Sequence, residues 1–153
     1  MKTDRTVDQM VQAARSGKQN IAEGCAAGCT SKETEIKLIN VAKASLQELL
    51  IDYEDYLRVR NLERWKADNA KFQQTRRVCA RHNDSAFYRE QLQTRSDEVV
   101  ANVAIILIHQ TDYILFKQIE FLKKDFLENG GIREEMSRAR RAYRDNNNKE
   151  KGF

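Results

Sequence analysis

The sequence predicts an all-α protein of one compact domain. The chain has 153 residues, contains no proline and has only six glycines, with none between Gly28 and Gly130. Long helices can therefore run without their commonest breakers. Two stretches, 31–61 and 97–128, repeat apolar residues at steps of three and four, which is the pattern of an amphipathic helix. A hydrophobic content of 41% is enough to fill a single core.

A first helix is predicted from about Thr6 to Ala27. Apolar residues recur along one side of it, namely Val7, Met10, Val11, Ala14, Ile21 and Ala22. Gly17 weakens the middle of this helix, because glycine costs about 1 kcal/mol relative to alanine in a helix interior. Small residues there also allow a second helix to approach closely.

A second helix, about 45 Å long at about 1.5 Å per residue, is predicted within Ser31 to Asn61. Its apolar stripe consists of Leu38, Val41, Ala42, Ser45, Leu46, Leu49, Tyr53, Tyr56 and Leu57. Thr30-Ser31-Lys32-Glu33 marks the start as a capping box, in which a hydroxyl and the Glu33 carboxylate satisfy unpaired backbone donors. Gly28 fits the end of the preceding helix.

Residues 62–95 have a weaker periodicity and are predicted to form one or two shorter helices. Turn signals occur at Asp68-Asn69 and at Asn83-Asp84-Ser85.

Another long helix is predicted from about Asp97 to Glu128, opened by Ser96 and closed by Asn129-Gly130-Gly131. Its apolar stripe is Val99, Val103, Ile106, Leu107, Ile114, Leu115, Ile119, Leu122 and Phe126. His109 lies along this stripe, so we expect a hydrogen-bonded core histidine. Beyond the glycines, 132–144 permits a helix and 145–150 is expected to be a frayed tail. The chain is thus divided into a bundle, 1–129, and a basic extension, 130–153.

Positive charge is concentrated in two segments of the chain. Residues 64–95 carry a net charge of +5 and residues 130–153 carry +3. The rest of the chain is net acidic, so the total net charge is +4. In the first segment, basic residues alternate with aromatic ones, a mixture that suits phosphate contacts and base stacking. The residues predicted to contact nucleic acid are Arg76, Arg77, Arg81, Arg138, Arg140, Arg141 and Arg144. The alternative is that these arginines only belong to solvent-exposed, charged faces of helices and bind nothing.

No catalytic motif is recognised, and we expect a protein that is not an enzyme and carries no cofactor. An acidic group on the second helix comprises Glu48, Asp52, Glu54 and Asp55. It lacks the Glu-x-x-His pairs of a di-metal bundle, so salt bridges are expected, within the chain or to the arginines of a neighbouring subunit.

Three cysteines and a histidine offer the residue types of a zinc site, and these are Cys25, Cys29, Cys79 and His82. Their spacing is not that of a standard finger or ribbon, and burial of free thiols explains the cysteines equally well. A Cys/His nucleophile would need an orienting group that the sequence does not indicate. We therefore expect no metal, although the zinc alternative stays open.

The N-terminal residues 1–5 lack the apolar core of a signal peptide, and no unbroken apolar run reaches about 18 residues. An odd number of cysteines without an export signal argues against a disulfide framework. A cytoplasmic protein with reduced thiols and no membrane partner is expected.

Several stretches carry a resemblance to a known family. Residues 20–24 (NIAEG), 31–38 (SKETEIKL) and 44–50 (ASLQELL) resemble the bacterial four-helix bundle family that includes proteins encoded in intervening sequences of large-subunit ribosomal RNA genes. Residues 101–110, and 129 onward through the arginine-rich tail, resemble a C-terminal suffix variant of that family. The accessory proteins of diversity-generating retroelements, which assist a reverse transcriptase, are more distant members.

The resemblance implies an antiparallel up-and-down four-helix bundle with long helices and a short C-terminal helical extension. It also implies a ring-like homo-oligomer, such as a pentamer, with RNA or DNA as a partner and a reverse transcriptase as a further one. A basic patch repeated around a ring would bind one polyanion at several points. Residues 66–95 resemble the family least, so the arginine assignments rest on charge. The alternative function is a protein–protein adaptor, such as a reverse-transcriptase accessory protein that does not itself bind RNA.

Overall fold

The computed structural model describes residues 5–150, and this part of the chain forms six helices and no strand. The helices are α1 (Arg5–Ala27), α2 (Lys32–Val59), α3 (Ala70–Arg81), α4 (Ser85–Leu92), α5 (Asp97–Asn129) and α6 (Ile132–Glu150). The predicted all-α class is confirmed. The first four residues of the predicted bundle segment and the last three of the predicted extension lie outside the described residues.

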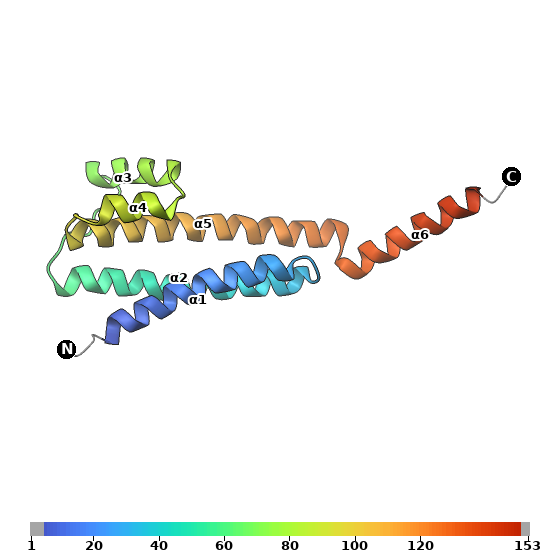
Figure 1. Cartoon of the computed structure of the whole chain (residues 1–153), viewed down its shortest axis with the longest axis horizontal. Helices are drawn as coiled ribbons and strands as arrows, with labels where there is room; N and C mark the ends of the chain where they lie inside the picture. Colours follow the sequence, from blue (N-terminus) through green and yellow to red (C-terminus); the bar gives the residue numbers. More distant parts are fainter. Residues whose placement is uncertain (1–4, 151–153) are drawn as a thin grey trace.

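Three long helices form the body of the molecule. α1 and α2 make an antiparallel hairpin, and α5 runs back along α2 (Figure 1). The two short helices, α3 and α4, lie over the N-terminal half of α5. α6 leaves the far end of α5 and points away from all the other helices (Figure 1). The N-terminal half of α5 therefore sits between α2 and the short helices.

Two hydrophobic clusters fill the interior, one on each side of α5. The first joins α1, α2 and α5, and includes the fully buried Ile39 and Leu57 together with Ile105 and Leu115. The second holds the short helices and the loop before them against α5, and its buried members are Trp65, Cys79, Val103 and Ile106. Because its apolar residues face both clusters, α5 contributes more buried hydrophobic residues to the core than any other described helix.

Small residues bring α1 and α2 close together, as the sequence predicted. Gly17 and Gly24 are buried on the face of α1 that meets α2, and a Cβ on Gly24 would lie 3.3 Å from the Cβ of Leu38. The expectation that valines form this face is wrong, because Val7 and Val11 are each about half exposed. The glycines take the contact because only they allow so close an approach.

Helix ends follow the expected signals with one change. The Ser31 hydroxyl caps α2 by accepting from the Thr34 amide at 3.2 Å, whereas the Thr30 hydroxyl turns back to the carbonyl of Ala27. The helix therefore begins one residue later than the predicted capping box requires. Asn69 and Asp84 cap α3 and α4. Gly130 ends α5 with φ +74° and ψ −173°, a conformation essentially reserved for glycine.

Three further expectations are wrong. Ile114 and Val41 belong to the predicted stripes but are 63% and 43% exposed, since no helix covers those sides of α5 and α2. The segment 145–150, expected to be frayed, continues α6. It contains neither glycine nor proline, so nothing in it breaks the helix.

One helix among the described residues, α5, is long and apolar enough to cross a membrane by length and composition. Its apolar residues do not form one unbroken run, because polar residues such as Gln110 and Asp112 interrupt them. A core helix meets the same criterion, and α5 buries Ala101, Ile105 and Ile119 against its neighbours. The core therefore explains part of its apolar character, while Tyr113, Ile114 and Phe121 of the same helix stay exposed.

Candidate nucleic-acid interface

The α3 helix presents a basic face. It contains Lys71, Arg76, Arg77 and Arg81 and no acidic residue. The opposite side of the helix is anchored on α5 through the buried Cys79 and the partly buried Phe72. Within residues 5–150, none of the three arginines forms an ion pair, and all three are exposed. Their guanidinium groups are therefore available to an anion from outside the molecule.

A pocket of about 470 Å³ lies beside this face, between α3, the loop before it and α5. Its lining combines aromatic and basic side chains, among them Arg64, Trp65, Phe72, Arg76, His109 and Tyr113. The indole N–H of Trp65 is buried and has no hydrogen-bond partner among the described residues. An unpaired buried donor costs about 1–3 kcal/mol, so this group lowers the stability of the loop that carries Trp65.

The loop that supplies Trp65 is fixed by one buried side chain. Asn102 of α5 accepts from the Trp65 amide at 2.8 Å and donates to the carbonyl oxygens of Glu63 at 2.8 Å and Glu98 at 2.9 Å. On the other side of the pocket, the Gln110 side chain donates to the carbonyl of Arg76 at 3.2 Å. The loop that carries Trp65 and the α3 helix, which both line the pocket, are thus each held to α5 by side-chain hydrogen bonds. Sequence reasoning missed Asn102, because a lone asparagine in an apolar stripe gives no signal of its loop partner.

His109 is not the core histidine that the sequence predicted. It is exposed and lines the pocket, because it lies on the side of α5 that neither α2 nor α3 covers. An imidazole at the pocket wall can stack or hydrogen-bond with a ligand, so this correction adds a residue to the candidate site.

The second group of predicted arginines lies on α6. Arg138 donates to the carbonyl of Asn129 at 2.5 Å, and Arg141 donates to the hydroxyl of Ser137 at 3.3 Å. Arg140 and Arg144 are exposed and have no ion-pair partner within residues 5–150. Figure 1 places α6 and α3 near opposite ends of α5. One chain therefore carries two separate basic patches.

The structure does not assemble the zinc site considered from the sequence. Cys25 and Cys29 lie exposed at the end of α1, whereas Cys79 is buried in α3. The ring of His82 stacks on Phe87 at 3.8 Å. Among the described residues, no group of three or more metal-ligating side chains comes together.

Burial also opposes thiolate chemistry at Cys79. It raises the pKa of the thiol above its ordinary value, and this outweighs a hydrogen bond with Tyr88 that acts in the opposite direction. The thiol therefore stays protonated at neutral pH, and a protonated thiol is a poor nucleophile. The same burial, together with the contact to Cys79, raises the pKa of Tyr88 to about 12.

Two members of the acidic group on α2 form the expected salt bridges. Glu54 pairs with Arg64 at 2.6 Å, and Asp55 pairs with Arg58 at 2.8 Å. Asp52 and Glu48 instead line a groove between α1 and α2. Half of the group is thus neutralised within the chain.

The chain matches no protein-family model, no curated protein and no solved structure. The resemblance to the four-helix bundle family therefore stays a prediction. Function has to be inferred from the α3 face and its pocket.

Proposed function

We propose that this chain is a non-catalytic, cytoplasmic protein that binds RNA through the α3 face and the adjoining pocket. The observation that carries the proposal is the arrangement of Arg76 beside Trp65. Arg76, Arg77 and Arg81 would contact successive phosphates, while an unpaired base would enter the pocket. Aromatic residues there would stack on the base. Binding of this kind is sequence-tolerant and falls as salt increases.

The proposal extends to assembly and family. The chain would be a four-helix-bundle protein that assembles into a pentameric ring. Such a homo-oligomer would repeat the α3 face around its symmetry axis. Several weak phosphate contacts would then act on one RNA strand. Arg138 and Arg141 of α6 stay exposed although each donates a hydrogen bond within the chain, and they would add to this surface. Ribosomal RNA or the template of a reverse transcriptase would be suitable ligands.

A protein–protein adaptor is the second candidate, and one observation favours it. Tyr113, Ile114 and Phe121 of α5 are each more than 60% exposed. Exposed apolar residues of this size commonly mark a protein contact. A reverse transcriptase docked on this surface would make the chain an accessory protein without RNA contacts of its own.

The two candidates separate in a binding assay with paired variants. Fluorescence anisotropy with an unstructured single-stranded RNA would compare wild type with Arg76→Ala/Arg77→Ala. Each lost charge-assisted contact costs about 1.5 kcal/mol or more, so affinity should fall at least about tenfold. The control is Arg15→Ala/Lys18→Ala, which removes the same charge from exposed positions on α1. Equal RNA affinities for the two variants would contradict the assignment of the binding site to α3. A wild-type protein that does not bind RNA would favour the adaptor function.

A further inference from the structure

The α6 helix is amphipathic, and within residues 5–150 most of its apolar side is uncovered. Ile132, Met136, Ala139 and Tyr143 recur at steps of three and four, which places them on one stripe. Met136 and Tyr143 are 67% and 69% exposed. Only the base of the helix is held, by Glu135, which pairs with Lys32 of α2 at 3.0 Å, and by Arg138. A fixed base with a bare apolar stripe makes α6 a ready docking element.

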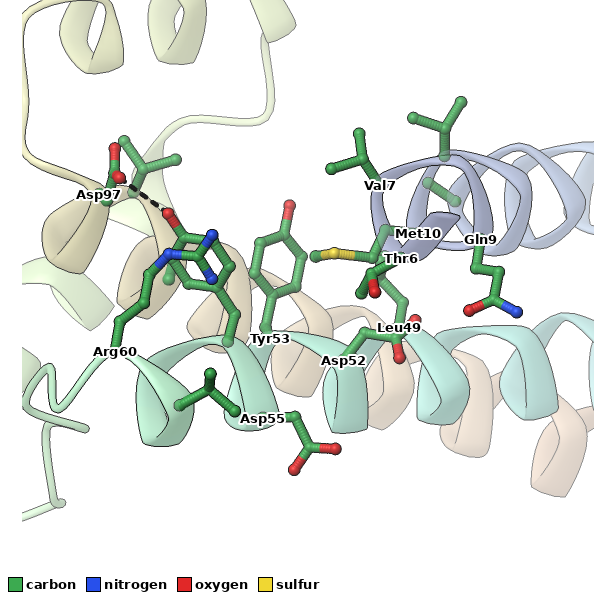
Figure 2. Close-up of a pocket in the computed structure, with 16 residues that line it drawn as sticks. Thr6, Val7, Gln9, Met10, Leu49, Asp52, Tyr53, Asp55, Arg60 and Asp97 are labelled. Atoms are coloured by element: carbon green, nitrogen blue, oxygen red, sulfur yellow. Dashed lines mark hydrogen bonds between the residues drawn. The ribbon is translucent and has the colours of Figure 1, made fainter. Parts of the chain in front are cut away.

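A cleft of about 680 Å³ opens at the opposite end of the body, between the start of α1, the end of α2 and the start of α5. Val7 and Val11 of α1 line it and are about half exposed. Met10 of α1 and Tyr53 of α2 face each other across it (Figure 2). The cleft is therefore mainly apolar, and it is open enough to receive side chains from outside.

The charges on this cleft and on α6 are complementary. Asp52, Asp55 and Asp97 line the cleft; Asp55 is already paired with Arg58, Asp97 accepts from the Tyr56 hydroxyl at 2.7 Å, and Asp52 forms no ion pair within residues 5–150. Arg60, the one cation among the lining residues, lies 3.9 Å over the ring of Tyr56. On α6, the 100° step per residue places Arg140 and Arg144 along one edge of the apolar stripe. The other exposed apolar surface, on α5, fits worse because it carries lysines.

The α6 helix is too short to place its apolar stripe in the cleft of the same chain. Tyr143 lies about 17 Å along α6 from Ile132, at about 1.5 Å per residue. The span of α5 from Asn129 back to Ala101 is about 42 Å by the same measure. Even if it folded back fully along α5, the stripe would end about 25 Å short of the cleft. The occupant must therefore come from another molecule.

We infer that the apolar stripe of α6 docks into the α1–α2–α5 cleft of a second copy of this chain. Met136 and Tyr143 enter between the valines of α1 and the tyrosines of α2. Arg140 and Arg144 meet Asp52 and the neighbouring aspartates at the rim. Each chain carries the helix at one end and the cleft at the other, so the contact is head-to-tail. Such contacts close into a ring or continue as an open chain. This inference rests on the proposed homo-oligomer and does not depend on RNA binding.

Sedimentation velocity on the full chain tests this docking with two variants that disable opposite halves of the contact. Met136→Asp removes the stripe and Val11→Asp blocks the cleft. Each should weaken self-association at least about tenfold, because each places an unpaired charge in an apolar contact. Leu127→Asp is the matched control, since Leu127 is 83% exposed on α5 and outside the contact. It should leave the assembly unchanged.

Mixing the two variants gives the decisive result. Val11→Asp keeps a working α6 and Met136→Asp keeps a working cleft, so an equimolar mixture should form a 1:1 heterodimer and nothing larger. Val59→Asp, at a 71% exposed position that also lines the cleft, replaces Val11→Asp if that variant melts early. Monomeric wild type would overturn the docking and the homo-oligomer together. An oligomer that both variants leave intact, or a mixture without heterodimer, would overturn the docking alone.

Discussion

Asn102 should be the most sensitive single position of the loop that builds the pocket. Its side chain makes three hydrogen bonds to backbone groups, and replacement by alanine removes all of them. The Trp65 amide is buried and would be left unpaired at a cost of about 1–3 kcal/mol. The carbonyl oxygens of Glu63 and Glu98 are only partly buried and lose about 1 kcal/mol together. Asn102→Ala should therefore lower the free energy of unfolding by about 2–4 kcal/mol.

Urea denaturation at a fixed protein concentration measures this loss. Asn40→Ala, at an exposed position on α2, is the control and should stay within about 0.5 kcal/mol of wild type. Asn102→Leu separates hydrogen bonding from volume, because leucine fills the space without satisfying the Trp65 amide. A leucine variant as stable as wild type would refute the hydrogen-bond reasoning, as would an alanine variant that loses less than about 1 kcal/mol.

Two further predictions concern titration and thiol reactivity. The hydrogen bond from Lys32 holds the pKa of the Asp125 carboxyl below its ordinary value. The ion pair therefore stabilises the folded protein at neutral pH, and this stabilisation is lost as the pH falls through the lowered pKa. Wild type should accordingly lose more melting temperature than Asp125→Asn between pH 7 and acid pH, and equal losses would contradict the pairing. Because Cys79 is buried with a raised pKa, a thiol reagent should label the two exposed cysteines quickly and Cys79 only on unfolding, as titration of reactive thiols in native and denatured protein would show.

Local signals in the sequence located the helices well. The absence of proline, the positions of the glycines and the polar caps bound the three long helices to within two residues, because these features act on the backbone directly. Gly130 is an example, since its φ of +74° is one that other residues rarely adopt. Periodicity found the stripes but not their exposure. Ile114 matches the pattern of a buried residue, yet it is 63% exposed.

The candidate site was only half predictable. Charge counting identified Arg76, Arg77 and Arg81, because the basic excess of residues 64–95 can be read from the sequence. The pocket beside them depends on contacts between residues far apart in the chain, such as the bond from Asn102 to the Trp65 amide. No spacing rule indicates such contacts. The distance between the α3 and α6 patches is likewise set by the fold, because the two helices lie near opposite ends of the long α5 helix.

The measurement that tests the central claim most directly is the affinity of wild type for single-stranded RNA across a series of salt concentrations. If the α3 face binds phosphates, the logarithm of the affinity should fall linearly with the logarithm of salt concentration, with a slope that counts the phosphates neutralised. The Arg76→Ala/Arg77→Ala variant should then show a slope shallower by about one to two, since it loses two such contacts. Binding that does not change with salt, or two identical slopes, would contradict RNA recognition by this helix.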